Sequence, residues 1–415
     1  MQPVRSERPG SVELDAVIFG GGAAGLWLLD TLHRRGFSTL LIERHALGAG
    51  QTIASQGIIH GGIKYTLAGS LTPSARAIRE MPGLWQAYLD GRRPPDLREA
   101  RVHSACCYLW RTESLRSALG MIGARVGLRS GVERVEQDRR PDALAGCPGD
   151  VFRVAEPVLD MPSVVRALAA GHSNRIIKIE DTAGVEFETS GPGRVERVTL
   201  RGPDGPLALS PRYVLFTAGA GNGELRLQVG LTSDAMQLRP LHMVLVRGRL
   251  PIFFGHCVDG AKTRVTITSA TDSQGRTVWQ IGGQLSEDGV GRDADSLIAH
   301  ARHEIACVLP GVNLDGTEWT TYRVDRAEGR TSGGLRPQGP TVQVEGNTIT
   351  AWPTKLALAP ETASMIADRC LPAGSDGTVG VARPTGPDEV IDAVKDFVRP
   401  DIALPPWERS ATWRT

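Results

Sequence analysis

The feature that most constrains this fold is a glycine-rich turn between two apolar runs near the amino end. The run Ala16 to Phe19 is short and apolar, as in a strand buried on both faces, and it stops at Gly20-Gly21-Gly22. Good helix formers then extend from Ala24 to Arg35, and Ser38 to Ile42 is typical of a second strand. This order predicts one complete βαβ unit.

The glycines at positions 20, 22 and 25 have the spacing G-x-G-x-x-G, and each has its own steric task. Gly20 allows a tight turn, Gly22 allows the backbone to approach a diphosphate, and Gly25 allows the helix to pack closely on the strand. The N–H groups of the first helical turn, around Ala23 and Ala24, point toward a bound anion, which the helix dipole also favours. The turn therefore predicts a dinucleotide site.

An acidic residue at the end of the second predicted strand strengthens this prediction. Glu43 follows Gly25 by 18 residues, and a carboxylate at this position accepts hydrogen bonds from ribose hydroxyls. Glu43 would repel a 2′-phosphate, which disfavours NADP. FAD and NAD share the ADP half, so the turn alone leaves both open.

The segment after Glu43 distinguishes them by resemblance. A simple NAD domain usually continues into another crossover helix, whereas residues 47–56 are rich in Gly, Ser, Thr and Gln. Thr52 to Tyr65, TIASQGIIHGGIKY, resembles the flavin-side motif of FAD-dependent glycerol-3-phosphate dehydrogenases and of L-2-hydroxyglutarate dehydrogenases. Both belong to the D-amino-acid-oxidase-like superfamily. The resemblance implies that FAD is the cofactor.

The resemblance extends to a second glycine turn. Tyr213 to Gly221 is an apolar strand that ends in Ala-Gly, like the second FAD-contacting turn of the superfamily. The FAD-binding residues predicted from the turn and the resemblance together are Gly20, Gly22, Ala23, Ala24, Gly25, Glu43, Arg44, Gln51, Thr52, Ser55, Gln56, Gly57, Ile58, Ala218, Gly219, Lys355 and Leu356.

The carboxyl third of the chain shows both a match to the superfamily and a departure from it. Arg336-Pro337 matches an Arg-Pro that stands beside the flavin. Trp352-Pro353-Thr354-Lys355 stands where the superfamily usually has several glycines, before a helix expected at Glu361 to Cys370. Lys355 could stabilise negative charge on a reduced flavin, and the alternative is a solvated loop lysine.

The remaining patterns predict an α/β fold: a Rossmann-like FAD-binding domain with an inserted α+β substrate domain built on an antiparallel sheet. The FAD-binding domain is expected at residues 14–90, 150–235 and 323–371, the substrate domain at 91–149 and 236–322, and a tail at 372–415. The expected elements include helices at Ser74–Leu89, Ser163–Ala170 (capped by Asp160 or Ser163) and Ala294–Val308, and a meander of Ile176–Ile179, Gly184–Glu188, Val195–Leu200 and Leu207–Leu209.

Flavin chemistry requires a proton acceptor and, for an anionic substrate, a cation. His60 is the preferred base because an imidazole titrates near neutral pH, although a structural or FAD-positioning histidine is a close alternative. Arg336 is the preferred cation on motif context, ahead of Arg330, Arg323 and Arg326, and a surface ion pair is the alternative for each. The predicted catalytic residues are His60, Arg336 and Lys355, and the predicted substrate contacts are His60, Lys64, Tyr65, Arg330 and Arg336.

The predicted function is an FAD-dependent dehydrogenase or oxidase that oxidises a small hydroxy acid, polyol phosphate or amino acid by hydride transfer. The alternative is an FAD-dependent monooxygenase or electron-transfer flavoprotein. Gly282-Gly283 lacks the spacing of a second dinucleotide turn and is expected to lack the following helix, which disfavours a pyridine-nucleotide reductase. The electron acceptor, whether oxygen, a quinone or a protein, stays open.

Composition sets the expected partners and compartment. A net charge of +1, from 47 basic and 46 acidic residues, predicts neither a nucleic-acid nor an anionic-membrane partner. The six cysteines form no C-x-x-C pair, which predicts no metal site and a cytoplasmic location. We expect no integral membrane segment, and we leave an oligomer open.

Overall fold

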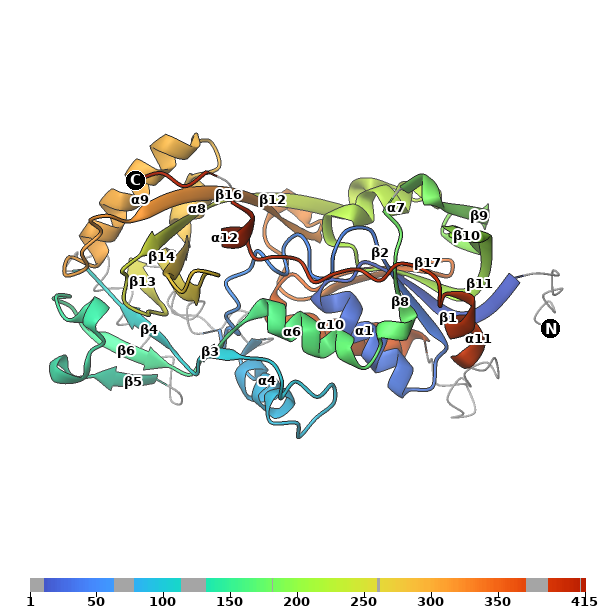
Figure 1. The fold of residues 1–415 in the computed structure, drawn as a ribbon, viewed down its shortest axis with the longest axis horizontal. Coiled ribbons are helices and arrows are strands. Elements are labelled where there is room, and N and C mark those ends of the chain that lie inside the picture. Colours follow the sequence, from blue (N-terminus) through green and yellow to red (C-terminus); the bar gives the residue numbers. More distant parts are fainter. Residues whose placement is uncertain are drawn as a thin grey trace.

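A computed structural model describes residues 11–62, 78–112, 132–180, 182–259, 262–370, 387–410 and 412–415. Two large sheets lie side by side along the long axis of the molecule (Figure 1). The first sheet has the order β17-β18-β11-β1-β2-β8, with β10 and β9 attached to β11. The second sheet has the order β16-β12-β15-β14-β13-β4-β6-β5. The predicted α/β class is confirmed, and the second sheet is antiparallel except for the parallel pair of β13 and β4.

The first sheet contains the predicted βαβ unit. β1 (Ser11–Phe19) pairs in parallel with β2 (Thr39–Glu43), and α1 (Ala23–Arg34) connects them within one residue of its expected bounds. The other strands are β8 (Ile176–Lys178), β9 (Val185–Gly191), β10 (Arg194–Gly202), β11 (Gly205–Phe216), β17 (Thr341–Glu345) and β18 (Thr348–Trp352). Because β8, β2, β1, β11 and β18 are parallel neighbours, their carboxyl ends meet at one edge, where such folds bind ligands.

The predicted meander was wrong in two respects. Ile176–Lys178 does not join it, but pairs with β2 at the far edge of the first sheet. The expected separate strands at 207–209 and 213–216 form one strand, β11. A proline at position 211 is tolerated there because, on one side of β11, pairing with β10 ends at Leu209 and pairing with β18 begins only at Val214.

Helices cover one face of the first sheet (Figure 1). They are α1, α4 (Met81–Leu89), α6 (Met161–Ala170) and α10 (Ala359–Cys370), and their apolar faces share one core cluster. Trp27 of α1 packs edge-on against Trp85 of α4, with ring centroids 5.0 Å apart. α11 (Pro387–Ala393) packs on the opposite face through Val390. Part of the predicted tail therefore belongs to the core of the first domain.

The predicted caps of α6 differ from those observed. Asp160 is the N-cap residue, but its carboxylate makes no capping bond and instead accepts from the Arg101 guanidinium, 2.6 Å away. The Ser163 hydroxyl donates to the Asp160 carbonyl oxygen and accepts from the Arg101 backbone N–H. Both side chains therefore tie α6 to the chain near residue 101.

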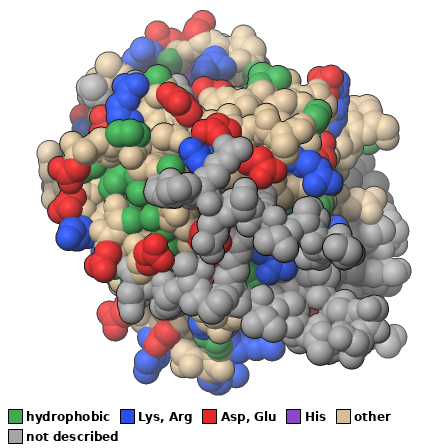
Figure 2. All heavy atoms as spheres, turned by 90° about the vertical axis from the view of Figure 1, so that its right-hand side faces the viewer, with side chains coloured by type: hydrophobic (Ala, Val, Ile, Leu, Met, Phe, Trp, Pro, Cys, Tyr) green, Lys and Arg blue, Asp and Glu red, His purple; other side chains and the backbone are tan. Residues whose placement is uncertain are grey.

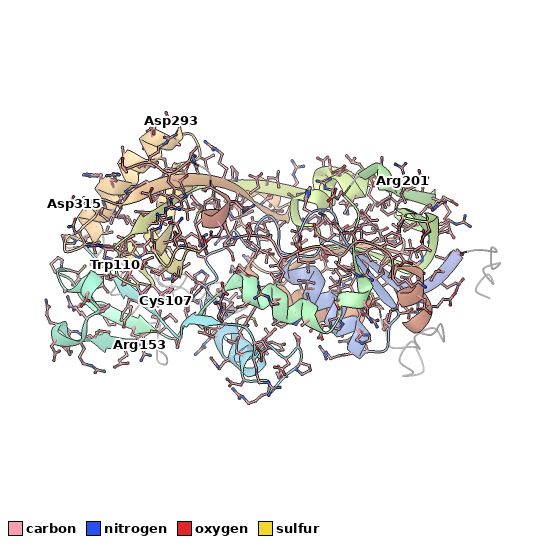
Figure 3. The ribbon with its side chains drawn as sticks, in the orientation of Figure 1. Cys107, Trp110, Arg153, Arg201, Asp293 and Asp315 are labelled. Carbon is pink, nitrogen blue, oxygen red and sulfur yellow. The ribbon has the colours of Figure 1, made fainter. Side chains whose placement is uncertain are left out.

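The second sheet encloses its own core with α9 (Ala294–Val308), which has the predicted bounds. Asp293, labelled at the start of α9 in Figure 3, caps it by accepting from the Ser296 N–H at 2.8 Å. Trp110 of β4, also labelled there, donates to the Val308 carbonyl oxygen at 2.9 Å. The strands are β4 (Cys107–Trp110), β5 (Val132–Val135), β6 (Val151–Val154), β12 (Met236–Gly248), β13 (Gly255–Asp259), β14 (Lys262–Thr271), β15 (Thr277–Gly282) and β16 (Glu318–Gly329).

Sheet membership differs from the predicted domain ranges at two places. β6, at residues 151–154, and the last part of β16, at residues 323–329, belong to the second sheet, although both lie in ranges predicted for the FAD-binding domain. α8 (Gln284–Asp288) directly follows Gly283, so the expectation that no helix follows the second glycine pair was wrong. The remaining strands and α-helices of the described residues are β3 (Val102–Ser104), β7 (Val158–Leu159), α7 (Asn222–Gln228) and α12 (Pro406–Arg409).

The surface and termini add two observations. On the described part of the face shown in Figure 2, basic and acidic side chains are interspersed. Trp413 packs under the Arg247 guanidinium, 3.9 Å from the ring centroid, so the carboxyl end of the chain lies against the second domain.

Within the ranges that the structure describes, no helix combines the length and apolar character needed to cross a bilayer.

Candidate functional site

The turn between β1 and α1 has the steric properties predicted for its glycines. Gly20 has a φ of +105°, and a Cβ there would stand 2.5 Å from the Ala218 Cα atom. A Cβ on Gly25 would stand 1.9 Å from the Gly20 carbonyl oxygen, so Gly25 is required for α1 to pack on β1. At Gly22, an added Cβ would meet only the Thr52 hydroxyl oxygen, at 3.1 Å. Gly22 is therefore the glycine whose missing side chain leaves open space.

We expect Gly25→Ala to lower the free energy of unfolding by about 3 kcal/mol, because the added methyl group must displace backbone that forms the turn. Denaturant unfolding followed by circular dichroism measures this loss. The control is Gly83→Ala in α4, where an added Cβ has no neighbour within 4 Å and alanine favours the helix by about 1 kcal/mol. Equal stability of the Gly25→Ala variant and the wild type would contradict the packing role.

The amino end of α1 and the end of β2 meet beside this turn. α1 begins without a side-chain cap and without an acidic residue in its first turn, and the Ala23 N–H donates to the Thr52 hydroxyl at 3.1 Å. Glu43 is buried and accepts from the Gly21 N–H at 2.6 Å and the His45 N–H at 2.8 Å. The amino end of a helix favours a bound anion. The Glu43 carboxylate lies beside the turn that leads into this helix, at the end of the neighbouring strand β2.

A cavity of about 730 Å³ opens from this turn and reaches the second sheet. Its walls come from the carboxyl ends of β1, β2, β11 and β18, the loop after β2, and the strands β12 and β16. Thirteen of the predicted cofactor residues line it: Gly20, Gly22, Ala23, Ala24, Glu43, Arg44, Gln51, Thr52, Ser55, Ala218, Gly219, Lys355 and Leu356.

The ends of β11 and β18 are fixed beside this cavity by a buried amide. Asn222 accepts from the Ala218 N–H at 2.7 Å and donates to the Ala351 carbonyl oxygen at 3.1 Å. The Trp352 indole N–H donates to the Gly219 carbonyl oxygen at 3.3 Å. The tryptophan that stands where the superfamily has glycine is therefore buried and braces the second glycine turn.

The loop after Trp352 keeps one glycine-like feature although it contains no glycine. Thr354 has a φ of +64°, a left-handed conformation that is uncommon for a residue other than glycine. Its hydroxyl donates to the Gly339 carbonyl oxygen at 2.8 Å, which helps to hold this conformation. The loop brings Lys355 and Leu356 to the cavity wall.

The loop after β2 makes hydrogen bonds to three strands of the second sheet, β16, β15 and β14. Gln51 accepts from the Ala327 N–H of β16 at 2.9 Å. The Ala54 carbonyl oxygen accepts from Tyr322 of β16 and from Gln280 of β15. The Gln56 amide donates to the Gln280 carbonyl oxygen at 2.9 Å and to the Thr266 carbonyl oxygen of β14 at 3.2 Å. The loop therefore joins the two domains.

Gln56, Gly57 and Ile58 do not line the cavity. A Cβ on Gly57 would stand 2.2 Å from the Leu159 carbonyl oxygen, and Ile58 forms a β-bridge with Val158. Gly25 also lies outside the lining. These four residues were predicted as cofactor residues, and in the structure they shape the turn and the loop.

His60, at the far end of this loop, forms a buried cluster with two residues that the sequence patterns did not indicate. Its Nδ1 atom lies 3.0 Å from the Glu156 Oε2 atom, and His256 of β13 stands beside the same carboxylate. His60 is not among the residues that line the 730 Å³ cavity. Lys64 and Tyr65, predicted as substrate contacts, lie outside the described residues.

The arginines are arranged differently from the prediction. Arg323 and Arg326, which were considered less favourable candidates, line the cavity, whereas Arg330 and Arg336 do not. Arg330 forms an exposed ion pair with Asp234 at 3.1 Å. Arg326 donates to Glu287 at 2.9 Å, and burial lowers the pKa of its guanidinium.

Arg336 lies next to a second buried acid. Its Nε atom is 3.9 Å from the carboxylate of the buried Glu328, which also accepts from Arg239 at 3.2 Å. Arg336 is therefore part of an ion cluster at the end of β16 rather than of the cavity wall. Its predicted contact with substrate stays a prediction.

The turn, the acid at the end of β2 and the long cavity together define a protein that binds an ADP-containing dinucleotide. The residues present fit FAD: Gly22 leaves room for a diphosphate, the amino end of α1 favours its charge, and the cavity continues into a second domain. The family described as FAD dependent oxidoreductase matches residues 15–359. The chain belongs to this family, and it is an FAD-dependent oxidoreductase.

Individual relatives agree with this assignment. The chain is 40% identical over 407 residues to the probable FAD-dependent oxidoreductase PA4991 of Pseudomonas aeruginosa, covering 96% of this chain and 99% of that protein. The crystal structure of PA4991 superposes with a TM-score of 0.77 at 34% identity, covering 97% and 99% of the two chains.

More distant structures share the fold alone. Glycine oxidase from Geobacillus kaustophilus gives a TM-score of 0.62 at 18% identity, covering 87% of this chain and 95% of that one. L-α-glycerophosphate oxidase from Mycoplasma pneumoniae, with FAD bound, gives 0.60 at 13% identity, covering 90% and 97%. The resemblance to the D-amino-acid-oxidase-like superfamily and the FAD cofactor, both predicted from the sequence, are confirmed by the family match.

Proposed function

We propose that this oxidoreductase is a dehydrogenase or oxidase that oxidises a small hydroxy acid, polyol phosphate or amino acid. The observation that carries the proposal is the cavity that runs from the glycine turn to β12 and β16 of the second domain, where Arg323 and Arg326 line it. When FAD is bound, its flavin ring accepts a hydride from the substrate. A guanidinium group that faced the cavity would suit a carboxylate or phosphate on that substrate.

The cofactor-binding roles follow from the lining of the cavity. Gly22 and the backbone of Ala23 and Ala24 would hold the diphosphate at the amino end of α1. Glu43 would accept from the ribose hydroxyls. The remaining predicted residues on the wall would enclose the rest of FAD: Gly20, Arg44, Gln51, Thr52, Ser55, Ala218, Gly219, Lys355 and Leu356.

The substrate class is supported by the structures that share the fold. One is named for glycine and another for L-α-glycerophosphate, and both substrates are small and carry an anionic group. His60 is the proposed proton acceptor, since a neutral imidazole paired with a carboxylate can take a proton near neutral pH. The acid partner, Glu156, holds the ring in one orientation.

An FAD-dependent monooxygenase or electron-transfer flavoprotein is the alternative, and flavin bleaching separates the two. We expect at least one compound from a panel of 2-hydroxy acids, glycerol 3-phosphate and amino acids to bleach the 450 nm flavin band under anaerobic conditions. NADH and NADPH serve as the comparison. Bleaching by a reduced pyridine nucleotide alone would replace the proposed function with the monooxygenase alternative.

A further inference from the structure

The carboxyl part of the chain runs along both domains and lies outside the family match, which covers residues 15–359. In Figure 1 its dark red ribbon leads from α11 along the first domain to α12 and then to the second domain. We call residues 398–410 and 412–414 the carboxyl segment. None of them lines the 730 Å³ cavity. Any effect of this segment on FAD must therefore act through the residues that it contacts.

The first part of the carboxyl segment is attached to the edge of the first sheet. The Val398 carbonyl oxygen accepts from the Lys178 N–H of β8 at 2.8 Å. The Arg399 guanidinium donates to the Ile176 carbonyl oxygen at 3.2 Å. Just before the segment, the Val394 side chain is buried in a core cluster of the first domain. This end of the segment is therefore fixed to the first domain.

The next residues of the carboxyl segment pair with the loop after β2. The Leu47 N–H donates to the Asp401 carbonyl oxygen at 2.8 Å, and the Ala403 N–H donates to the Leu47 carbonyl oxygen at 2.9 Å. These two bonds form a parallel β-bridge between Leu47 and Ile402. The segment thus uses both backbone groups of Leu47.

Leu47 lies directly against the glycine turn. Its side chain is buried, and a Cβ on Gly21 would stand 2.5 Å from the Leu47 Cδ2 atom. The next residue, Gly48, donates its N–H to the Gly21 carbonyl oxygen at 2.8 Å. Residues 49–52, which follow at once, line the cavity. The carboxyl segment therefore holds the residue from which the cavity-lining part of the loop leaves the glycine turn.

The last part of the carboxyl segment is attached to the second domain. Glu408 of α12 accepts from the Ser273 N–H at 2.7 Å and from the Ser273 hydroxyl at 2.8 Å. Ser273 lies in the turn between β14 and β15. Further along, the Arg414 N–H donates to the Trp319 carbonyl oxygen of β16 at 2.8 Å. The segment is thus fixed at both ends and bonded to the loop between them.

We propose that the carboxyl segment positions the FAD-binding loop: its pairing with Leu47 holds residues 49–52 against the glycine turn and so strengthens FAD binding, and its attachment to both domains keeps this pairing in place. Asp401, Ile402 and Ala403 are positioning residues, because they contact Leu47 and do not line the cavity. Such coupling is reciprocal, so bound FAD stabilises the pairing in turn. The inference concerns the cofactor and does not depend on the proposed substrate.

A proline at position 403 tests the pairing, because proline has no N–H to donate to the Leu47 carbonyl oxygen. We expect Ala403→Pro to weaken FAD binding about 10-fold, the effect of one lost hydrogen bond. The control is Leu404→Pro, since Leu404 is exposed and its N–H donates to no backbone oxygen among the described residues. Titration of FAD into the folded apoproteins measures both affinities. Equal affinities of the two variants would overturn the proposal.

Hydrogen exchange of the wild type tests the coupling without a variant, and it decides the proposal if Ala403→Pro does not fold. The Leu47 and Ala403 amides belong to the same pairing, so they open together. We expect FAD to slow the exchange of both amides by a similar factor, about 10-fold or more, and to leave the amides of α9 unchanged. Exchange at Ala403 that does not respond to FAD would overturn the proposal.

The attachment to the second domain is tested with Glu408→Ala, which removes both bonds to Ser273. We expect FAD binding about 3-fold weaker than in the wild type. The double variant with Ala403→Pro should bind FAD as Ala403→Pro alone does, because both changes loosen the same pairing. Wild-type affinity in Glu408→Ala, or losses that add in the double variant, would overturn the role of this attachment.

Discussion

Replacing His60 with alanine leaves FAD bound and slows the reduction of FAD by substrate at least about 100-fold. The alanine removes the imidazole that faces Glu156, so the substrate proton has no positioned acceptor. We expect FAD content to stay unchanged, because the substitution leaves the glycine turn and Glu43 on the cavity wall in place. Absorbance at 450 nm measures both the bound FAD and its rate of bleaching by the substrate identified in the panel.

The matched control is His303→Ala, which removes an exposed histidine of α9 in the second domain. It should retain the wild-type rate of reduction. If His60→Ala is reduced at the wild-type rate, His60 has no part in the reaction. If His60→Ala is instead isolated without FAD, the histidine positions the cofactor, which was the close alternative.

The first domain was predictable because its signals are local. The helix α1 and the strand β2 each begin and end within one residue of the expected positions, since glycines and the change of hydrophobic period mark their ends. α9 in the second domain was found for the same reason, with Asp293 as its cap. Pairing partners were less predictable: residues 176–178 look like any short apolar strand, and only the fold places them beside β2.

The cluster around Glu156 was not predictable from spacing. Glu156 and His256 lie 96 and 196 residues from His60, and each stands alone in its segment. The one local signal was the position of Glu156, a charged residue between the strand-like run Val151–Val154 and Pro157. Burial of an acid implies a partner, but the identity of that partner depends on how two domains meet.

The arginines show how strand geometry decides a site. Arg323 and Arg326 belong to β16, which pairs along its whole length with β12, and both residues line the cavity. Their guanidinium groups donate to the segment at 287–292. Arg336 lies seven residues beyond the end of β16, and Arg330 one residue beyond it. Motif context favoured Arg336, but the course of the strand determined which arginine residues line the cavity.

Gly22→Val should fold and yet lose FAD, which makes it the sharpest test of the cofactor site. Gly22 has φ −77° and ψ −177°, an extended conformation that valine adopts readily. An added Cβ meets only the Thr52 hydroxyl oxygen, so the side chain occupies the cavity where the diphosphate is proposed to bind. Overlap of this kind costs about 3 kcal/mol, which weakens FAD binding about 100-fold.

Titration of FAD into the apoprotein, followed by flavin fluorescence, measures this loss, and thermal unfolding of the apoprotein checks the fold. Gly291→Val is the control, because Gly291 is exposed, has no neighbour within 4 Å of an added Cβ and is not among the residues that line the cavity. It should bind FAD like the wild type. Wild-type affinity in folded Gly22→Val would mean that the diphosphate does not lie at the β1–α1 turn, because a side chain of that size cannot share the space with it.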